Sequence, residues 1–342
     1  MEQRLALVGF GNVGQAFARL LLRKKELLAK DFGITFRVTG IATGRHGMAI
    51  NPGGLDLTRA LEIVEKGGSL NSLSSTAVPG SMLEFIRTCP ADALFENSPV
   101  NVADGQPAVD HLKAALERGM HAITANKGPV VHAHKELMEL AAAHKRRFMF
   151  ESTVMDGAPI FSLFRGALPA ADLRGFKGIL NSCTNLLLGL MEEGKSFDDA
   201  VSYAQSIGIA ETDPSGDIDG WDASIKAAAL ITVMMGLPFK PQQVDRQGIR
   251  GVTPAMIEEA RQANERWKLV CTARREGNTV TARVAPERVS AGSPLFSING
   301  TSSYCQFEMD VLPGLGIVES NPSPETTAYG LLADWLNAIR NM

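Results

Sequence analysis

The fold is decided by the segment Arg4-Leu5-Ala6-Leu7-Val8-Gly9-Phe10-Gly11-Asn12-Val13-Gly14. Its first five residues read as a short apolar strand, and the amphipathic run from Gln15 to Leu28 follows as a helix. Glycines spaced G-x-G-x-x-G between a strand and a helix let a pyrophosphate approach the backbone amides of the helix N-terminus. The segment predicts a Rossmann-type α/β domain in which Gly9 through Gly14 contact a dinucleotide. The alternative is a glycine-rich turn that binds no ligand.

The end of the second strand bears on which dinucleotide is bound. We expect that strand over Thr35 to Ile41, and it leads into Ala42-Thr43-Gly44-Arg45-His46. Many NAD-specific proteins place Asp or Glu here for the 2′-hydroxyl of the adenosine ribose, whereas arginine suits a 2′-phosphate. Because no acid is present and Arg45 is close, the sequence favours NADP, with NAD as the second choice. The alternative is that Arg45 only faces solvent.

Two further polar turns follow predicted strands. Ala93–Glu96 leads into Asn97-Ser98-Pro99, and His121–Thr124 leads into Ala125-Asn126-Lys127. Open α/β sheets bind ligands at the carboxyl ends of their strands, so we expect Ser98 and Lys127 to face the dinucleotide crevice. Helices over 106–118 and 134–144 and a strand over 147–152 complete a domain that we place at residues 1–150.

The second half of the chain has a different pattern. A strand over 173–180, a helix to 191 and a helix over 197–207 precede an acidic loop and the helix 221–235. Beyond it we expect a helix over 258–268 and strands over 269–274, 280–289 and 306–311 in an antiparallel sheet. A glycine turn over 312–316 and a final helix over 326–339 follow. We therefore place an α+β substrate and dimerisation domain at 151–312 and a returning C-terminal segment at 313–342.

The acidic loop and the start of the next helix carry the strongest candidates for chemistry. Residues 208–226 hold five carboxylates and one lysine: Glu211, Asp213, Asp217, Asp219, Asp222 and Lys226. Residues four apart share a helix face, so Asp222 should hold the ammonium of Lys226 and direct it toward the loop. The alternative is a solvated loop beside an ordinary ion pair. The spacing does not fit an EF-hand calcium loop.

Bulk properties exclude several classes of protein. The 342 residues are 45% hydrophobic and 21% charged with a net charge of -3, as in a globular protein without a nucleic-acid footprint. No apolar run is long enough for a membrane span and no signal peptide is evident, so we expect a cytoplasmic protein. The four cysteines and six histidines show no metal-site spacing.

Taken together, the motifs resemble homoserine dehydrogenase from about residue 4 to the end. The matching segments are Gly9–Gly14, Thr124–Lys127, Gly178–Asn181 and the block from Ala204 through Lys226. The resemblance implies an NAD(P)-dependent homodimer that interconverts L-homoserine and L-aspartate 4-semialdehyde on the route to threonine and methionine. It also implies a short form without an ACT domain, for which threonine feedback is not expected.

The resemblance assigns roles to individual residues. Lys226 matches the proton donor and Lys127 a catalytic lysine that contacts both cofactor and substrate. The matching substrate-binding positions are Glu211, Asp222 and Asp217. Ser98, Gly208 and Gly316 match cofactor contacts, with Gly314 as an alternative to Gly316. A monovalent cation site, usually sodium and built largely from carbonyl oxygens, matches Glu151, Val154, Asp156 and Ala158.

Three segments depart from the family pattern. Val154-Met155-Asp156-Gly157 replaces a more glycine-rich turn, Ser182-Cys183 replaces Gly-Thr, and Leu312–Gly316 varies a Gly-Pro-Gly-Ala-Gly turn. These departures leave two other functions open: a related NADP-dependent dehydrogenase of another amino- or hydroxy-aldehyde, and a non-catalytic dinucleotide-binding paralogue. The presence of all four polar residues of the proposed site argues against the paralogue: Lys127, Glu211, Asp222 and Lys226.

Overall fold

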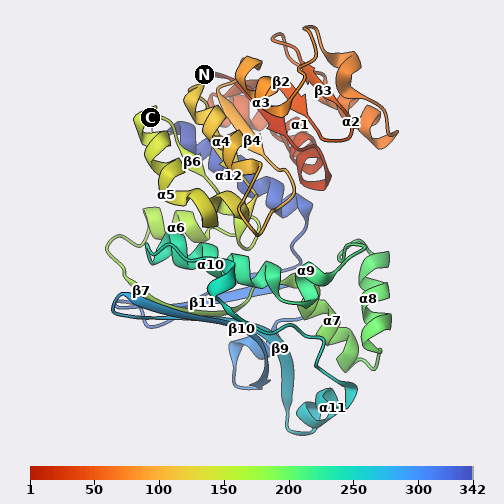
Figure 1. Ribbon diagram of the computed structural model, residues 1–342, viewed down its shortest axis with the longest axis vertical. Coiled ribbons are helices and arrows are strands. Elements are labelled where there is room, and N and C mark those ends of the chain that lie inside the picture. Colours follow the sequence, from red (N-terminus) through yellow and green to blue (C-terminus); the bar gives the residue numbers. More distant parts are fainter. Residues whose placement is uncertain (341–342) are drawn as a thin grey trace. The chain divides into compact units, whose positions relative to one another are not determined.

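The computed structural model describes residues 1–340, which form two units with one sheet each (Figure 1). The first unit is Met1–Pro159 together with the segment that starts at Ser323, and the second is Ile160–Pro322. An α/β unit of Rossmann type followed by a mixed-sheet unit confirms the predicted fold class.

The sheet of the first unit has the strand order β3-β2-β1-β4-β5-β6. Adjacent strands run parallel except for the short β3, which pairs antiparallel with β2. From β1 the chain moves to β2 on one side and later to β4 on the other, so a crevice opens at the carboxyl ends of β1 and β4. The strands are β1 Glu2–Val8, β2 Thr35–Ala42, β3 Met48–Ile50, β4 Ala93–Glu96, β5 His121–Thr124 and β6 Phe148–Met149.

Helices cover both faces of this sheet because its strands are apolar on both sides. Leu5 and Leu7 of β1 pack in one core with Phe17 of α1 and Trp335 of α12. The intervening residues of β1 pack with Phe85 of α3 in a second core. The helical elements are α1 Asn12–Phe32, α2 Leu57–Glu65, η1 Leu70–Leu73, α3 Met82–Thr88, α4 Ala108–Glu117, α5 Lys127–Ala143, η2 Glu151–Thr153 and α12 Pro324–Arg340.

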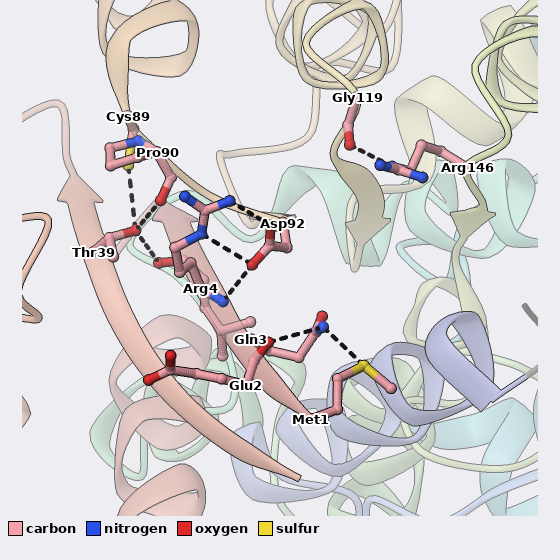
Figure 2. A network of polar contacts seen from close by, with 11 residues as sticks. Met1, Glu2, Gln3, Arg4, Thr39, Cys89, Pro90, Asp92, Gly119 and Arg146 are labelled. Atoms are coloured by element: carbon pink, nitrogen blue, oxygen red, sulfur yellow. Dashed lines mark hydrogen bonds and ion pairs between the residues drawn. The ribbon is translucent and has the colours of Figure 1, made fainter.

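Polar contacts fix the amino ends of the same strands (Figure 2). Arg4 donates to Asp92 through its backbone N–H at 2.8 Å and through Nη2 at 2.7 Å. Thr39 Oγ1 donates to the Pro90 carbonyl at 2.9 Å. Burial alone would raise the pKa of Asp92, but the hydrogen bonds from Arg4 outweigh it and hold the pKa below its usual range. Asp92 therefore joins β1 to the start of β4 as an ionised group.

The second sheet has the strand order β12-β11-β7-β9-β10-β8. Its pairs are antiparallel except for β10 with β8. Its strands are β7 Leu173–Ile179, β8 Asp245–Arg246, β9 Glu265–Glu276, β10 Thr279–Ser290, β11 Ser303–Met309 and β12 Leu315–Glu319. The helical elements are α6 Ile160–Gly166, α7 Ser182–Glu192, α8 Phe197–Ser206, α9 Ser215–Ile218, α10 Trp221–Met234, η3 Pro241–Gln243, α11 Pro254–Gln262 and η4 Pro294–Ser297.

Four predicted elements differ from the structure. The helix predicted over 258–268 ends at Gln262, and a left-handed Asn264 precedes β9, which pairs with β10 along its whole length. This ladder outweighs the local helix pattern. The last two residues of the glycine turn predicted over 312–316 belong to β12, which pairs with β11. The helix predicted from 134 is present, but a further helical segment from Lys127 precedes it in α5, capped by Asn126 through the Gly128 N–H and separated from it by a kink at the non-helical Ala133. The strand predicted over 147–152 is shortened to β6 and continues as η2.

Candidate functional site

The glycine turn after β1 leaves open the space that a pyrophosphate needs. Gly9 has a φ of +86°, and a Cβ there would overlap the Asn97 carbonyl. A Cβ on Gly14 would overlap the Gly9 carbonyl oxygen, so this glycine lets α1 pack on the turn. A Cβ on Gly11 would meet no atom within 4 Å. Gly11 also begins α1 without a side-chain cap or an acid in the first turn, so the helix N-terminus suits an anion.

Arg45 lies just beyond the carboxyl end of β2. It is exposed on a tight turn in which Thr43 N–H donates to the Gly47 carbonyl at 3.0 Å and His46 N–H donates to Thr43 Oγ1 at 2.6 Å. Among the salt bridges of residues 1–340, none involves Arg45. The turn holds the backbone, and the guanidinium extends into solvent, where it would be accessible to a 2′-phosphate.

Polar groups also collect after β4 and β5. Both polar atoms of the Asn97 side chain and the Ser98 hydroxyl are buried and have no hydrogen-bond partner among the described residues. Such groups usually have a partner, so their place beside Gly9 fits a bound ligand. Lys127 is half-buried at the first turn of α5, and Asn126 Nδ2 donates to the Ser98 carbonyl at 3.0 Å.

The second unit holds the predicted lysine–aspartate pair. Lys226 Nζ lies 2.9 Å from Asp222 Oδ2 and donates to the Leu180 carbonyl at 2.7 Å. The two side chains are 16% and 23% exposed, so this is no ordinary surface pair. The predicted proximity of Asp222 and Lys226 on α10 is confirmed. Gly220, with a left-handed φ of +81°, lets the chain turn from α9 into α10.

Asn181, the last residue of the matching segment Gly178–Asn181, belongs to this cluster, although the sequence analysis gave it no role. Its Nδ2 donates to Asp217 Oδ1 at 2.6 Å and to Asp222 Oδ2 at 2.9 Å, while its Oδ1 accepts from the Thr184 N–H. One amide thus joins the two acids to the carboxyl end of β7. The available signal was a polar residue directly after a strand, the same signal that selected Ser98 and Lys127.

Cys183 lies beside the same acids. Burial raises the pKa of its thiol, and the neighbouring Asp217 and Asp222 raise it further. The thiol is therefore neutral beside these two carboxylates. Ser182-Cys183, which departs from the family pattern, therefore lies next to Asp217, a predicted substrate-binding residue.

The loop before α9 presents Glu211 at the surface. Gln205 Nε2 holds the backbone by donating to the carbonyls of Glu211 and Thr212 at 3.0 and 3.2 Å. The Glu211 carboxylate is exposed and makes no ion pair with the described residues. Gly208 follows the C-cap of α8 with a φ of +74°, and a Cβ there would meet no atom within 4 Å. Asp219, in contrast, is structural, because Arg250 Nε binds its carboxylate at 2.5 Å.

The segment proposed for a monovalent cation forms a tight turn in the first unit. Met155 and Asp156 both have left-handed φ values, and Ala158 N–H donates to the Met155 carbonyl at 2.8 Å. Glu151 and Val154 are buried. In residues 1–340, no three His, Cys, Asp or Glu side chains gather as metal ligands, and the resemblance implies a site built largely from carbonyl oxygens. A turn of this kind can supply them.

Gly316 lies within β12 of the second sheet, opposite Gln306. A Cβ at this position would lie 2.5 Å from Tyr304 Oη, so packing against Tyr304 alone accounts for a glycine here. Within the described part of the chain, no helix has the length and apolar character needed to cross a membrane.

A G-x-G-x-x-G turn at the switch point of a parallel sheet, joined to a unit with a held lysine, defines an NAD(P)-dependent oxidoreductase. Residues 9–151 match the family model of the NAD-binding domain of homoserine dehydrogenase, and residues 159–336 match the model named homoserine dehydrogenase. The chain belongs to the homoserine dehydrogenase family. It interconverts L-homoserine and L-aspartate 4-semialdehyde with NAD(P).

Relatives match over almost the whole chain. The NAD(+)-dependent homoserine dehydrogenase of Pseudomonas canavaninivorans is 34% identical over 97% of this chain and 95% of its own length. The homoserine dehydrogenase of Methanocaldococcus jannaschii is also 34% identical, over 97% of each chain. A hyperthermophilic archaeal homoserine dehydrogenase solved in complex with NADPH is 29% identical, with a TM-score of 0.83 over 100% of this chain and 99% of that one.

Proposed function

We propose that Lys226 is the acid–base residue of the reaction and that Asp222 keeps it charged and oriented. The observation that carries this proposal is the position of Nζ, 2.9 Å from Asp222 Oδ2 and 2.7 Å from the Leu180 carbonyl. Reduction of the aldehyde places negative charge on its oxygen, and an ammonium stabilises that charge before donating the proton. In the reverse direction the lysine accepts the proton of the homoserine hydroxyl.

The other polar residues bind and orient the substrate. Glu211 presents a carboxylate to the substrate ammonium, and the linked acids Asp217 and Asp222 complete this binding set. Lys127, at the first turn of α5, contacts both cofactor and substrate. A bound nicotinamide supplies or accepts the hydride. The protein residues orient the reacting groups and stabilise the developing charge.

For the cofactor, we propose a preference for NADP. Arg45 is exposed at the end of β2, and residues 42–46 contain no acid for a ribose 2′-hydroxyl. The relatives differ, since one is named as NAD(+)-dependent and another was solved with NADPH. We further propose that residues 9–14, Ser98, Gly208 and Gly316 contact the cofactor.

We also propose a monovalent cation, sodium, in the turn that holds Glu151, Val154, Asp156 and Ala158. The two left-handed residues of this turn favour carbonyl donors. The enzyme is further proposed to act in the cytoplasm as a homodimer, with the second unit providing the subunit contacts.

Substitution of Lys226 tests the central role. Lys226→Ala should lower kcat by about 10²–10⁴-fold, the usual contribution of a general acid–base, and leave the Kd for NADPH unchanged. Turnover is followed as NADPH oxidation with L-aspartate 4-semialdehyde, with NADH in parallel to measure cofactor preference. Binding is measured by nicotinamide fluorescence.

The matched control is Lys135→Ala, which removes an exposed lysine from another i,i+4 pair, 3.9 Å from Glu139. It should behave as the wild type. Near-normal turnover by Lys226→Ala would show that another group moves the proton. Equal rates with NADH and NADPH would refute the role given to Arg45.

A further inference from the structure

The first unit contains a buried carboxylate that the proposed chemistry does not use. Glu96, the last residue of β4, is 0% exposed, and His111 of α4, 4% exposed, lies 3.4 Å away between Nδ1 and Oε1. A carboxylate in this position is costly unless hydrogen bonds replace the water it has lost. The hydrogen-bond partners of Glu96 therefore indicate which parts of the fold it holds in position.

Its two oxygens contact two different ligand loops. Oε1 accepts from the Ser98 N–H at 3.1 Å, in the turn after β4. The Thr124 hydroxyl, at the end of β5, donates to the Glu96 carbonyl at 2.8 Å and shares this hydrogen with Oε2 at 3.2 Å. Since β4 and β5 are parallel neighbours with Glu96 opposite Thr124, one side chain reaches both strand ends at the carboxyl edge of the sheet.

From Thr124 the contacts continue to the start of α5. The Asn126 N–H donates to Thr124 Oγ1 at 2.9 Å, and Asn126 Oδ1 caps the helix by accepting from the Gly128 N–H at 2.9 Å. Asn126 Nδ2 returns to the Ser98 carbonyl at 3.0 Å. The hydrogen bonds thus form a closed ring in which a displaced member shifts both loops.

We propose that Glu96 is a positioning residue for the reaction, a buried carboxylate that fixes the Ser98 turn and the start of α5 relative to each other. Glu96 thereby fixes the positions from which Ser98 contacts the cofactor and Lys127 contacts the cofactor and substrate. This inference rests on the roles proposed for Ser98 and Lys127. It adds a residue that touches neither ligand.

The same strand offers a matched control. Asp92 precedes β4 at the opposite edge of the sheet, where it binds Arg4 and contacts neither ligand loop (Figure 2). Glu96→Gln and Asp92→Asn are equivalent isosteric changes that each replace a carboxyl group by an amide. Thr124→Val removes the next member of the ring without touching the carboxylate. It provides a second test if Glu96→Gln does not fold.

The experiment compares these variants in the full chain by thermal unfolding, NADPH fluorescence and steady-state kinetics. Glu96→Gln and Thr124→Val should each raise the Kd for NADPH and lower kcat by about tenfold, the effect of losing one hydrogen bond to a charged group. Asp92→Asn should lower the melting temperature without changing either constant. If Glu96 served only stability, Glu96→Gln would behave like Asp92→Asn, with a lower melting temperature and unchanged Kd and kcat.

Combination with Lys127→Ala distinguishes the possible failures. If Glu96 acts through Lys127, the double variant should lose less activity than the product of the two single losses. The inference alone is overturned if Lys127→Ala is impaired while Glu96→Gln and Thr124→Val resemble Asp92→Asn. If Lys127→Ala and Ser98→Ala keep full activity and binding, the proposed roles of those residues fail, and the positioning role fails with them.

Discussion

At the scale of single residues, the direction of Lys226 depends on two acceptors from separate elements. Asp222 is one turn away on α10, and the Leu180 carbonyl lies at the end of β7. An exposed i,i+4 pair contributes only about 0.2–0.5 kcal/mol and leaves the lysine mobile. Here the second acceptor and the partial burial of both side chains restrict the ammonium to one direction, which a proton donor requires.

The same cluster shows which residues of a site a sequence can predict. Asp222 and Lys226 lie within one helix, so the helical period alone brings them together. Asn181 is 41 residues from Asp222 in the chain, and it meets Asp222 only because β7 ends beside the start of α10. Local patterns contain no information on such a contact. A polar residue after a strand indicates an edge position without naming its partner.

His121 leads to a prediction for stability against pH. The ring is 2% exposed, and its Nδ1 accepts from the Arg147 N–H at 3.1 Å, so the neutral form is the one that fits. Burial, helped by the charges of Arg146 and Arg147, lowers its pKa to about 4. Between pH 6.5 and 4 the unfolded chain binds a proton that the native protein does not. The free energy of unfolding should therefore fall by on the order of 2 kcal/mol across this window.

The measurement is urea unfolding of the wild type and His121→Asn between pH 4 and 7.5. Asparagine does not titrate, so the free energy of unfolding of the variant should depend less steeply on pH. The difference between the two proteins at pH 7.5 gives the cost of the substitution itself. If the free energies of unfolding of the two proteins depended on pH in the same way from pH 4 to 7.5, His121 would have the same pKa in the folded and unfolded states.

At the scale of elements, the glycines in the turn between β1 and α1 have two different roles. Gly9 and Gly14 are needed for close packing, and Gly11 is needed to leave room for the ligand. Gly14→Ala places a methyl group against the Gly9 carbonyl, so it should destabilise by about 1–3 kcal/mol, more than the better helix propensity of alanine restores. Gly11→Ala meets open space at a φ of -77° and should leave stability near the wild type. Its methyl group would lie where the pyrophosphate approaches, so the Kd for NADPH should rise by about tenfold or more.

Thermal unfolding and nicotinamide fluorescence on the two variants test this division. Wild-type NADPH affinity in Gly11→Ala would place the pyrophosphate elsewhere. The strand–turn–helix pattern was predictable because all its determinants are local. The start of β9 was not, since residues 265–268 carry a helical pattern and become a strand only through pairing with β10.

At the scale of the whole molecule, the second sheet has an exposed edge. Within the described chain β12 pairs only with β11, and the exposed apolar residues Val311, Leu312 and Val318 lie on or just before it. A groove of about 770 Å³ crosses the same sheet, lined by polar side chains including Lys177, Arg274 and Glu308. Exposed strand edges with apolar side chains are sites of pairing with another chain.

We therefore predict that the proposed homodimer forms through this edge and groove, in a two-fold arrangement in which each copy presents the same surface. Val318 is 56% exposed, so Val318→Asp should not disturb the core, but it would put two carboxylates near the dimer axis and shift the protein toward monomer. Sedimentation velocity over a range of concentrations measures the shift. Val78→Asp, a change of the same kind at an exposed valine of the first unit, should remain dimeric. A Val318→Asp protein as dimeric as this control would place the interface elsewhere.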